Sequence, residues 1–327
     1  MRAIRIKRPG SYEVLELVER PTPSAGPDDL LIRVRAAAVN RADCMQRQGT
    51  YPTPAGVDWG DIPGLEVAGE VVAIGEAVTE FVPGDRVFGL VQQGGYAEFA
   101  LVDRGLALPI PEQSSFVEAA GVIEAFATAN ETVFEVGGLT SGETILIHAA
   151  GSGVGSTAVQ MAKAAGARVI ASAGNEAKLQ RLSELGADFT INYKEQDFVR
   201  EARRVAGDGV DLVLDFIGAD YLARNLAVLR PGGRLVLVGQ LGNPTCVFDP
   251  ADVIAKRLTI RGFTLRPQSL AEKRNIVRRV GQRWLPMFRN GRIRPVLHGS
   301  FPLAEAPAAH QLMETNATFG KLVLEVG

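Results

Sequence analysis

Residues 143–175 read ETILIHAAGSGVGSTAVQMAKAAGARVIASAGN. A short apolar run, 144–148, leads into a glycine-rich turn, 150–155. Small residues at helical spacing follow the turn, and a second apolar run occupies 168–172. A strand, a glycine turn, a helix and a strand within about thirty residues form the mononucleotide-binding unit of a doubly wound parallel sheet. The rest of the chain is therefore placed relative to this unit.

Composition limits what kind of protein this is. The chain has 327 residues, 46% hydrophobic and 22% charged, with a formal net charge of −2. This length can hold two domains, and the nearly neutral charge predicts neither a nucleic-acid nor a membrane surface. The start lacks a signal-peptide pattern, and no apolar run reaches the roughly twenty residues of a membrane-spanning helix. With Cys44 and Cys246 as its only cysteines, we expect a reduced, cytoplasmic protein.

The first 120 residues or so predict a β-rich domain. Short strand candidates separated by Pro and Gly turns lie at 3–6, 14–18, 29–38, 66–74, 86–88 and from 94–99 onward. Many short strands of this kind are typical of a barrel-like β domain. Apolar residues at helical spacing then predict one helix over 116–136, with Ser114 or Ser115 as its N-cap.

Strand–helix repeats follow this helix. The strands are expected at 144–148, 168–172, 189–192, 211–216 and 234–238, and the helices near 153–165, 176–185, 196–206 and 220–229. Asn175 and Asp220 suit N-caps, whereas Gly186 and Gly232 suit helix ends. Residues 258–265 predict an edge strand, and 269–289 one long amphipathic helix. A β tail at 296–297, 302–303 and 321–326 is expected to return to the first domain.

The glycine-rich turn and the end of the following strand predict a cofactor. Small residues let the backbone approach a pyrophosphate at the amino end of a helix, although a tight turn without a ligand is the alternative. Dinucleotide folds that prefer NAD end the second strand with an acid, but here Ser172-Ala173-Gly174-Asn175 contains none. Lys178 follows one turn later and favours a 2′-phosphate, hence NADPH, unless it is only a solvated helix charge.

Several longer segments carry a family resemblance. They are VNRADCMQRQGTYPTPAG (39–56), IPGLEVAGEV (62–71), PGDRV (83–87), LIHAAGSGVG (146–155), INYKEQDF (191–198), LRPGGRLVLVG (229–239) and FGKLVLEV (319–326). In this order, and over essentially the whole chain, they resemble the zinc-independent quinone oxidoreductase branch of the medium-chain dehydrogenase/reductase superfamily, most of all its p53-inducible members.

The resemblance implies an α/β fold of two domains. A GroES-like β-barrel catalytic domain would span 1–121 and 267–327, and a doubly wound Rossmann domain binding NADPH would span 122–266, with the active site in the cleft between them. In the family, the 2′-phosphate site would here be Gly174, Lys178 and Tyr193. The pyrophosphate site would be Ser152, Gly153 and Val154. Positions lining the ribose and nicotinamide match Asn40, Thr128, Gly218, Gly239, Gln240, Leu241, Phe263, Leu265 and Asn316.

No metal site is expected. Leu65 stands where a zinc-ligand histidine of the superfamily's alcohol dehydrogenases would precede Glu66, and two cysteines cannot build a four-thiolate site. Glu66 and Glu124 are therefore interpreted as structural. His148 is expected in the core at the end of a strand, and His298 and His310 are interpreted as structural or solvated because no nucleophile or metal partner is evident.

The reaction implied is hydride transfer from NADPH to a quinone, in particular an ortho-quinone. Tyr51 would orient or protonate the substrate oxygen, with loop packing as its alternative role, and Asn40 would hydrogen-bond the ribose or the substrate carbonyl. Arg41 and Asp43 are expected to pair within their loop. The first rival is reduction of the C=C bond of an alkenal or enone. The second is a non-enzymatic NADPH-binding protein with a structural or sensor role.

The expected partners are few. The sequence predicts a small-molecule quinone or enone substrate and a homodimer that pairs residues 258–265 of two copies, with a tetramer as the alternative.

Overall fold

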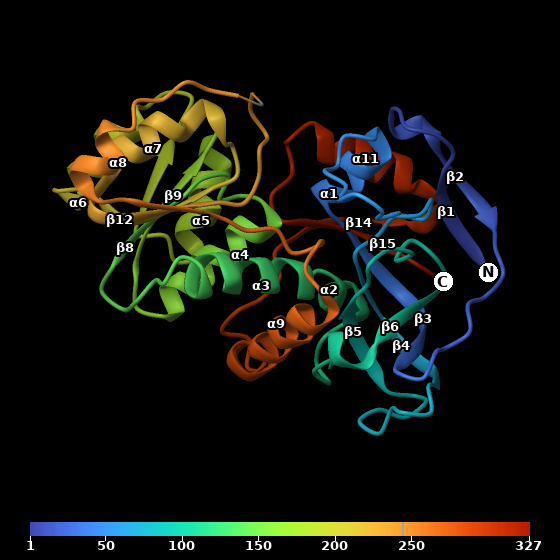
Figure 1. Ribbon diagram of the computed structural model, residues 1–327. Coiled ribbons are helices and arrows are strands. Elements are labelled where there is room, and N and C mark those ends of the chain that lie inside the picture. Colours follow the sequence, from blue (N-terminus) through green and yellow to red (C-terminus); the bar gives the residue numbers. More distant parts are fainter. Residues whose placement is uncertain (244) are drawn as a thin grey trace. The chain divides into compact units, whose positions relative to one another are not determined.

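A computed structural model describes residues 1–243 and 245–327, which form two compact units (Figure 1). Unit 1 comprises Met1–Ala125 and Arg266–Gly327, and unit 2 comprises Phe126–Leu265. The first junction follows Ala125 rather than residue 121, inside helix α3 (Ile123–Asn130), and the second follows Leu265 rather than residue 266. Within the described residues, no helix has both the length and the apolar character needed to cross a membrane.

Unit 2 is built on a six-stranded parallel sheet in the order β10-β9-β8-β11-β12-β13. Its strands are β8 (Thr144–Ile147), β9 (Arg168–Ala173), β10 (Phe189–Asn192), β11 (Val210–Asp215), β12 (Leu229–Leu237) and β13 (Thr259–Gly262). The chain leaves β8 toward β9 and β10 and then crosses back to β11. The glycine-rich turn after β8 therefore lies where the strand order reverses, which is where doubly wound sheets bind ligands.

Helices cover both faces of this sheet. They are α4 (Gly153–Ala164) and α5 (Glu176–Glu184), then α6 (Phe198–Ala206), α7 (Leu222–Val228) and α8 (Ala251–Lys256), the last three grouped together in Figure 1. Phe198 and Leu226 from this group pack in one buried cluster with Val213 of the sheet. All residues of β11 are buried, which explains its nearly continuous apolar sequence, because a central parallel strand has no solvent face.

Unit 1 is the β-rich part of the chain. Its larger sheet has the order β14-β15-β3-β4-β5-β7, with β6 also paired to β3, and β1 pairs with β2. The strands are β1 (Arg2–Ile6), β2 (Leu15–Glu19), β3 (Asp29–Val39), β4 (Glu66–Ile74), β5 (Arg86–Leu90), β6 (Phe99–Asp103), β7 (Ala107–Pro109), β14 (Leu297–Pro302) and β15 (Lys321–Glu325). The tail returns to this unit as predicted, because β15 pairs antiparallel with β3.

The helices of unit 1 are α1 (Arg41–Gln48), α2 (Phe116–Ala120), α9 (Leu270–Arg283), α10 (Leu285–Arg289) and α11 (Ala306–Glu314). Neither α1 nor α8 of unit 2 was predicted. The single helix expected over 116–136 is wrong: α2 ends at Ala120, α3 follows, and a π-helical turn occupies Glu131–Glu135. The helix expected over 269–289 is also divided, because Pro286 lies in the first turn of a new helix, α10, and cannot donate a backbone hydrogen bond to α9.

Helix caps and strand ends give mixed outcomes. Ser115 caps α2, where its Oγ accepts the Glu118 N–H, and Asn175 caps α5. Asp220 does not cap α7; its carboxylate accepts the backbone and side-chain N–H groups of Asn243 instead. Gly232 is not a helix end but a turn of positive φ inside β12. The strand expected from 94–99 starts only at Phe99, and β13 is shorter than 258–265.

Candidate functional site

The carboxyl ends of the parallel strands form one edge of unit 2. Because all six strands run the same way, the segments that follow them meet at that edge. Most of the predicted cofactor residues of this unit follow a strand end: Ser152, Gly153 and Val154 after β8, Gly174 after β9, Tyr193 after β10, Gly218 after β11, Gly239, Gln240 and Leu241 after β12, and Phe263 and Leu265 after β13. Thr128 is the exception, since it lies buried on α3.

The turn after β8 delivers the amino end of α4 to this edge. Ser152 caps the helix, its Oγ accepting the Gly155 N–H at 3.0 Å. Gly155 has no room for a side chain, because a Cβ would lie 2.6 Å from the Ala149 carbonyl oxygen. The N–H groups of Gly153 and Val154 belong to the first turn, where a helix offers them no acceptor of its own. These donors and the helix dipole suit a pyrophosphate.

A basic group of side chains, Lys178 and Lys194 with the Tyr193 hydroxyl, lies by Gly174 at the end of β9. A Cβ on Gly174 would lie 2.7 Å from the Tyr193 hydroxyl and 3.1 Å from Cε of Lys194, so only glycine lets these two side chains come this close to the backbone. Lys178 is fixed nearby, since the Asn175 side chain caps its backbone N–H at 2.9 Å. Burial, and then the positive charge of Lys194, lower the pKa of Lys178. Two neighbouring ammonium groups suit a dianionic phosphate, and the sequence analysis missed Lys194.

Asp215 shapes the loops after β11 and β12. Its carboxylate accepts the N–H groups of Ile217 at 2.8 Å and Gly218 at 3.0 Å, and burial raises its pKa to about 6. The loop it holds lies beside the next one, because the Leu241 N–H donates to the Phe216 carbonyl at 3.1 Å. The loops that carry Gly218 and Leu241 are therefore fixed together, by a residue that sequence motifs gave no reason to select.

In unit 1 the sheet register assembles a buried charged cluster around Asn40. Asn40 follows β3, Lys321 begins β15 and Glu66 begins β4; the pairings Leu322↔Val39 and Val67↔Ala37 bring these three positions together. The Lys321 ammonium donates to Asn40 Oδ1 and to Glu66 Oε1, each at 2.6 Å, and Asn40 Nδ2 donates to Glu66 at 3.1 Å. Burial alone would lower the pKa of Lys321, but the carboxylates of Glu66 and Glu124 outweigh it and raise that pKa.

This cluster does not fit the zinc found in alcohol dehydrogenases of the superfamily. Among the residues that the structure describes, no group of three or more His, Cys, Asp or Glu side chains could hold a metal ion. Leu65 is buried next to Glu66, whose oxygens receive N–H donors from Lys321, Asn40 and the Glu124 backbone. The Lys321 ammonium supplies a positive charge next to Glu66.

The pairing predicted between Arg41 and Asp43 is wrong. Arg41 donates to the Met313 carbonyl and to Asn316 Oδ1, at 2.8 and 2.6 Å, which ties the exposed Asn316 to α1. Asp43 is instead buried, where it accepts the Asn40 N–H at 2.8 Å and the Tyr96 hydroxyl at 3.0 Å. Burial raises the pKa of Asp43 to about 6. The capping box of α1 causes the difference, because it turns Asp43 back toward Asn40.

The three histidines lie in different surroundings. His148 is buried and hydrogen-bonded to Ser172 Oγ and Asn225 Oδ1, each at 2.9 Å, as a core residue should be, and burial lowers its pKa to about 4. His310 is also buried, 3.2 Å from the Tyr96 hydroxyl, and burial lowers its pKa to about 3. Exposed His298 accepts the Phe319 N–H at 3.3 Å.

Tyr51 lies half-buried in the loop between α1 and β4. Its ring meets Trp59 edge-on with 5.9 Å between the ring centroids. The guanidinium carbon of Arg266 lies 4.2 Å from the Trp59 centroid and 5.2 Å from that of Tyr51. Tyr51 is therefore part of a group of two aromatic rings and one cation, a setting that the sequence did not reveal.

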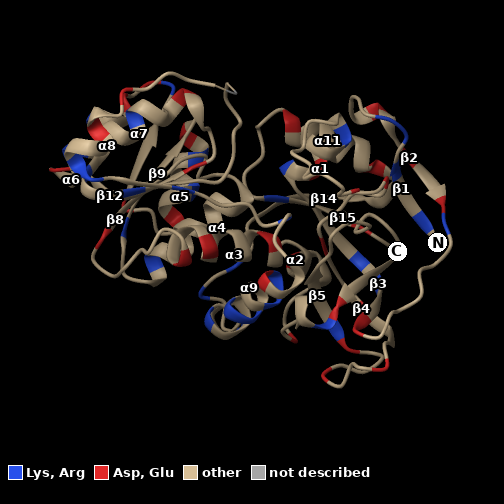
Figure 2. Cartoon of the chain, in the orientation of Figure 1, with Lys and Arg blue, Asp and Glu red and all other residues tan. Residues whose placement is uncertain are grey.

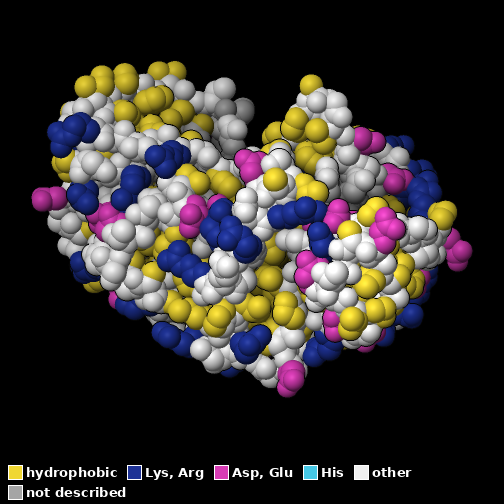
Figure 3. Space-filling view, turned by 60° about the horizontal axis from the view of Figure 1, so that its bottom comes forward, with side chains coloured by type: hydrophobic (Ala, Val, Ile, Leu, Met, Phe, Trp, Pro, Cys, Tyr) yellow, Lys and Arg dark blue, Asp and Glu magenta, His cyan; other side chains and the backbone are white. Residues whose placement is uncertain are grey.

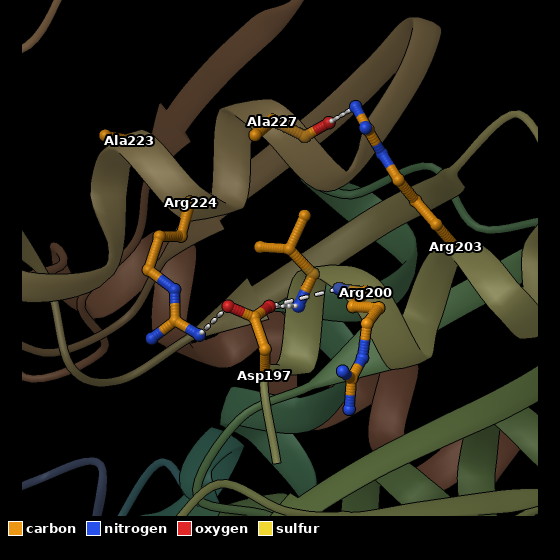
Figure 4. A pocket seen from close by; sticks show the side chains of 7 residues that line it. Asp197, Arg200, Arg203, Ala223, Arg224 and Ala227 are labelled. Carbon is orange, nitrogen blue, oxygen red and sulfur yellow. Dashed lines mark hydrogen bonds and ion pairs between the residues drawn. The ribbon is translucent and has the colours of Figure 1, made fainter.

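A surface hollow of about 770 Å³ lies elsewhere, between α6 and α7 (Figure 4). The charged side chains that line it already have partners. Asp197 accepts two backbone N–H groups at the start of α6 and forms an ion pair with Arg224. Arg203 donates to the Ala227 carbonyl. Its lining includes neither the glycine-rich turn nor the basic group at Gly174. This hollow therefore lacks the groups predicted to hold the cofactor.

Comparison with known proteins identifies the two units. Residues 26–112 match the alcohol dehydrogenase GroES-like domain, and residues 153–279 match the domain described as a zinc-binding dehydrogenase. Quinone oxidoreductase of Rattus norvegicus is 32% identical over 99% of this chain and 97% of its own. The fold and these matches define an oxidoreductase that uses a nicotinamide cofactor. The chain belongs to the zinc-independent quinone oxidoreductase branch of the medium-chain dehydrogenase/reductase superfamily.

Solved structures show the same fold over the whole chain. The Escherichia coli quinone oxidoreductase complexed with NADPH has a TM-score of 0.90 at 28% identity, covering 99% of this chain and 100% of that one. An NAD-dependent alcohol dehydrogenase has a TM-score of 0.88 at 33% identity, and the CurK enoyl reductase one of 0.88 at 28%. The former covers all of both chains, and the latter all of this chain and 99% of its own. The fold alone thus decides neither the cofactor nor the acceptor.

Proposed function

We propose that this protein reduces quinones, ortho-quinones in particular, by hydride transfer from NADPH without a metal ion. The observation that carries the cofactor choice is the basic group at Gly174, where the Tyr193 hydroxyl and Lys194 lie close to the glycine and the charge of Lys194 acts on Lys178. A 2′-phosphate would satisfy both ammonium groups, whereas the free hydroxyls of NADH would leave them without a counter-charge. The quinone oxidoreductase relatives support the acceptor.

The side chains of Asn40 and Tyr51 would bind and orient the cofactor and the substrate. Bound NADPH would supply the hydride, and reduction of the quinone to hydroquinone needs one proton in addition. Lys321 donates to Asn40 Oδ1 and Asn40 Nδ2 donates to Glu66, which fixes the amide and leaves the second N–H of Nδ2 for a further acceptor. We assign its second N–H to the ribose or to the substrate carbonyl, and Tyr51 to orienting the substrate oxygen. Solvent can supply the proton, since a hydroquinone oxygen is only weakly basic.

A substrate panel tests this function. The purified protein should oxidise NADPH steadily with 1,2-naphthoquinone, more slowly with para-quinones and least with alkenals or enones. NADH should be a poorer donor. Faster turnover with an enone than with any quinone would replace the proposed reaction by C=C reduction, which the fold shared with the CurK enoyl reductase makes the second candidate. Tight NADPH binding without turnover of either class would show a non-enzymatic NADPH-binding protein.

The two cysteines of the chain suit a protein of the cytoplasm. Cys44 and Cys246 are both free thiols, and Cys44 is buried, where burial raises its pKa to about 12. Such a thiol is inert, and a protein without disulfides suits a reducing compartment.

We also propose a homodimer through strand β13. This strand ends the sheet of unit 2, all of its residues are exposed, and Ile260 and Ile254 are 36% and 74% exposed nearby. An unpaired edge with apolar side chains can continue its sheet with a second copy across a twofold axis. Light scattering should give a dimer mass for the wild type and a monomer mass for Ile260→Lys, whereas Val82→Lys in unit 1 should stay dimeric. A wild-type monomer would refute the proposal.

A further inference from the structure

Arg266 is a buried cation with most of its hydrogen-bonding capacity unused. Its side chain is 5% exposed, and its Nη2 donates to Gln46 Oε1 at 2.8 Å and to the Gln92 carbonyl at 3.2 Å. Its Nε and Nη1 are buried without any hydrogen-bond partner. These two atoms carry three of the five N–H donors of a guanidinium. A buried donor without an acceptor is costly, so this arrangement indicates a missing partner.

A second buried cation lies near the first. Lys273, in the first part of α9, is 9% exposed, and burial followed by the positive charge of Arg266 lowers its pKa. In the described part of the chain, neither side chain forms an ion pair with a carboxylate. Asp43 is the acid whose charge acts on Arg266, but it is already bonded to Asn40 and Tyr96. Two neighbouring buried cations without a paired anion favour an anionic ligand.

The surrounding elements add to this preference. Helix α9 is strongly basic, as Figure 2 shows in blue, with Glu272 as its only acid and that acid held by the Ser269 cap. On the face that Figure 3 shows, acidic, basic and apolar side chains are interspersed. The aromatic rings of Trp59 and Tyr51 lie within 4.2 and 5.2 Å of the guanidinium carbon. The group therefore combines positive charge with flat apolar surfaces, which suit an aromatic ring that carries an anion.

One role of Arg266 is already visible and does not account for the unused donors. Gln46 accepts from Arg266 and donates to the carbonyls of Trp59 and Gly60, so the Nη2 contacts fix the loop that holds Trp59. This fixing uses only one nitrogen. The atoms Nε and Nη1 do not take part in it.

We propose that Arg266 and Lys273 form a binding subsite for an anionic substituent of the acceptor, a carboxylate or sulfonate carried on an aromatic quinone. The inference rests on the proposed quinone reductase function and names its substrate class. Charge-assisted hydrogen bonds from the unused N–H groups of Arg266 would hold the anion, and the ammonium of Lys273 would add a second positive charge.

A matched pair of acceptors tests the subsite. Steady-state KM with NADPH is measured for 1,2-naphthoquinone and for its 4-sulfonate, in the wild type and in Arg266→Met, Lys273→Met and the exposed control Arg278→Met. Arg266→Met should raise the KM of the sulfonate at least about tenfold, the loss of one charged hydrogen bond, and that of the neutral quinone less than about threefold. Lys273→Met should act in the same direction but less strongly, and Arg278→Met should leave both values unchanged.

Separate readouts keep the inference distinct from the proposed function. Calorimetric binding of 2-naphthalenesulfonate, which cannot be reduced, should be weakened in Lys273→Met and in Arg266→Lys, a variant that keeps the charge if Arg266→Met fails to fold. If no quinone is reduced but this binding is present and is weakened in Lys273→Met, the reaction is wrong and the subsite stands. Equal KM changes for the charged and neutral quinones, or equal binding by wild type and both variants, would show that Arg266 only fixes the loop.

Discussion

Replacing Lys178 by alanine should separate the two nicotinamide cofactors. The change removes one of the two ammonium groups of the basic group at Gly174. It leaves the turn that would hold the pyrophosphate unchanged. A hydrogen bond to a charged group contributes about 1.5–3 kcal/mol, and each 1.4 kcal/mol changes affinity about tenfold. NADH lacks the 2′-phosphate and makes no use of the lost charge.

The structure sets the expected loss near the lower end of that range. In the free protein Lys178 is repelled by Lys194, so removing Lys178 also relieves an unfavourable interaction, and Lys194 remains to meet the phosphate. We expect the Kd of NADPH to rise about tenfold and that of NADH less than about twofold. Lys194→Ala, at an exposed position, should have a smaller effect, because solvent screens its charge. The double variant should lose more binding free energy for NADPH than the two single variants together, because no second lysine remains to compensate for the first.

Fluorescence titration of both cofactors at low and high salt measures these losses. Lys163→Ala is the matched control: it removes a lysine of the same unit that pairs with Asp188 at 2.5 Å on another part of the surface. Its NADPH affinity should equal that of the wild type. Equal losses of affinity for NADPH and NADH in Lys178→Ala, or no loss of NADPH affinity, would refute the assignment of the basic group at Gly174 to the 2′-phosphate.

Three further outcomes are expected. Lys321→Met should lower the free energy of unfolding in urea by about 3–5 kcal/mol, because it leaves the buried carboxylate of Glu66 without its cation. Combining Glu66→Gln with Lys321→Met should regain part of this loss. An unchanged free energy of unfolding in Lys321→Met would contradict the buried ion pair. The raised pKa of Asp43 means that its contribution to stability is present below about pH 3.8 and is lost as the pH rises through about 6. Compared with Asp43→Asn, the wild type should therefore lose about 2 kcal/mol more between pH 4 and 7 in urea titrations, and parallel pH profiles would argue against it. Exhaustive chelation should leave quinone reduction unchanged, and stoichiometric zinc in elemental analysis of the active protein would overturn the metal-free mechanism.

Local signals in the sequence were enough to predict the parallel sheet. The apolar run at 144–148 coincides closely with the observed strand β8 (Thr144–Ile147), because a strand covered on both faces has to be largely apolar. The interruption of the helix predicted over 116–136 was not visible, since apolar spacing continues across Gly121 even though the backbone stops being helical there. Pro286 did indicate a break in the helix predicted over 269–289, but the prediction gave more weight to the amphipathic pattern on both sides of it.

The buried charges could not be predicted in the same way. A lysine or arginine read from sequence is assigned to the surface, because its burial depends on partners that are distant along the chain. Lys321 meets Asn40 and Glu66 only through strand pairing. Lys194 was missed for a different reason: it follows Tyr193 directly, but its approach to Gly174 depends on how β9 and β10 pair.

The sheet register explains why the tail of the chain has to return to unit 1. The segment before residue 125 supplies Asn40 and Glu66 to the buried cluster, and the returning segment supplies the compensating cation, Lys321. The pairing Leu322↔Val39 places Lys321 next to Asn40, and a slip of one residue would point its side chain to the other face of the sheet. The buried carboxylate of Glu66 would then be left without compensation, which no metal among the described residues could supply. The strand that closes the sheet of unit 1 therefore also provides the charge that fixes Asn40 as a hydrogen-bond donor.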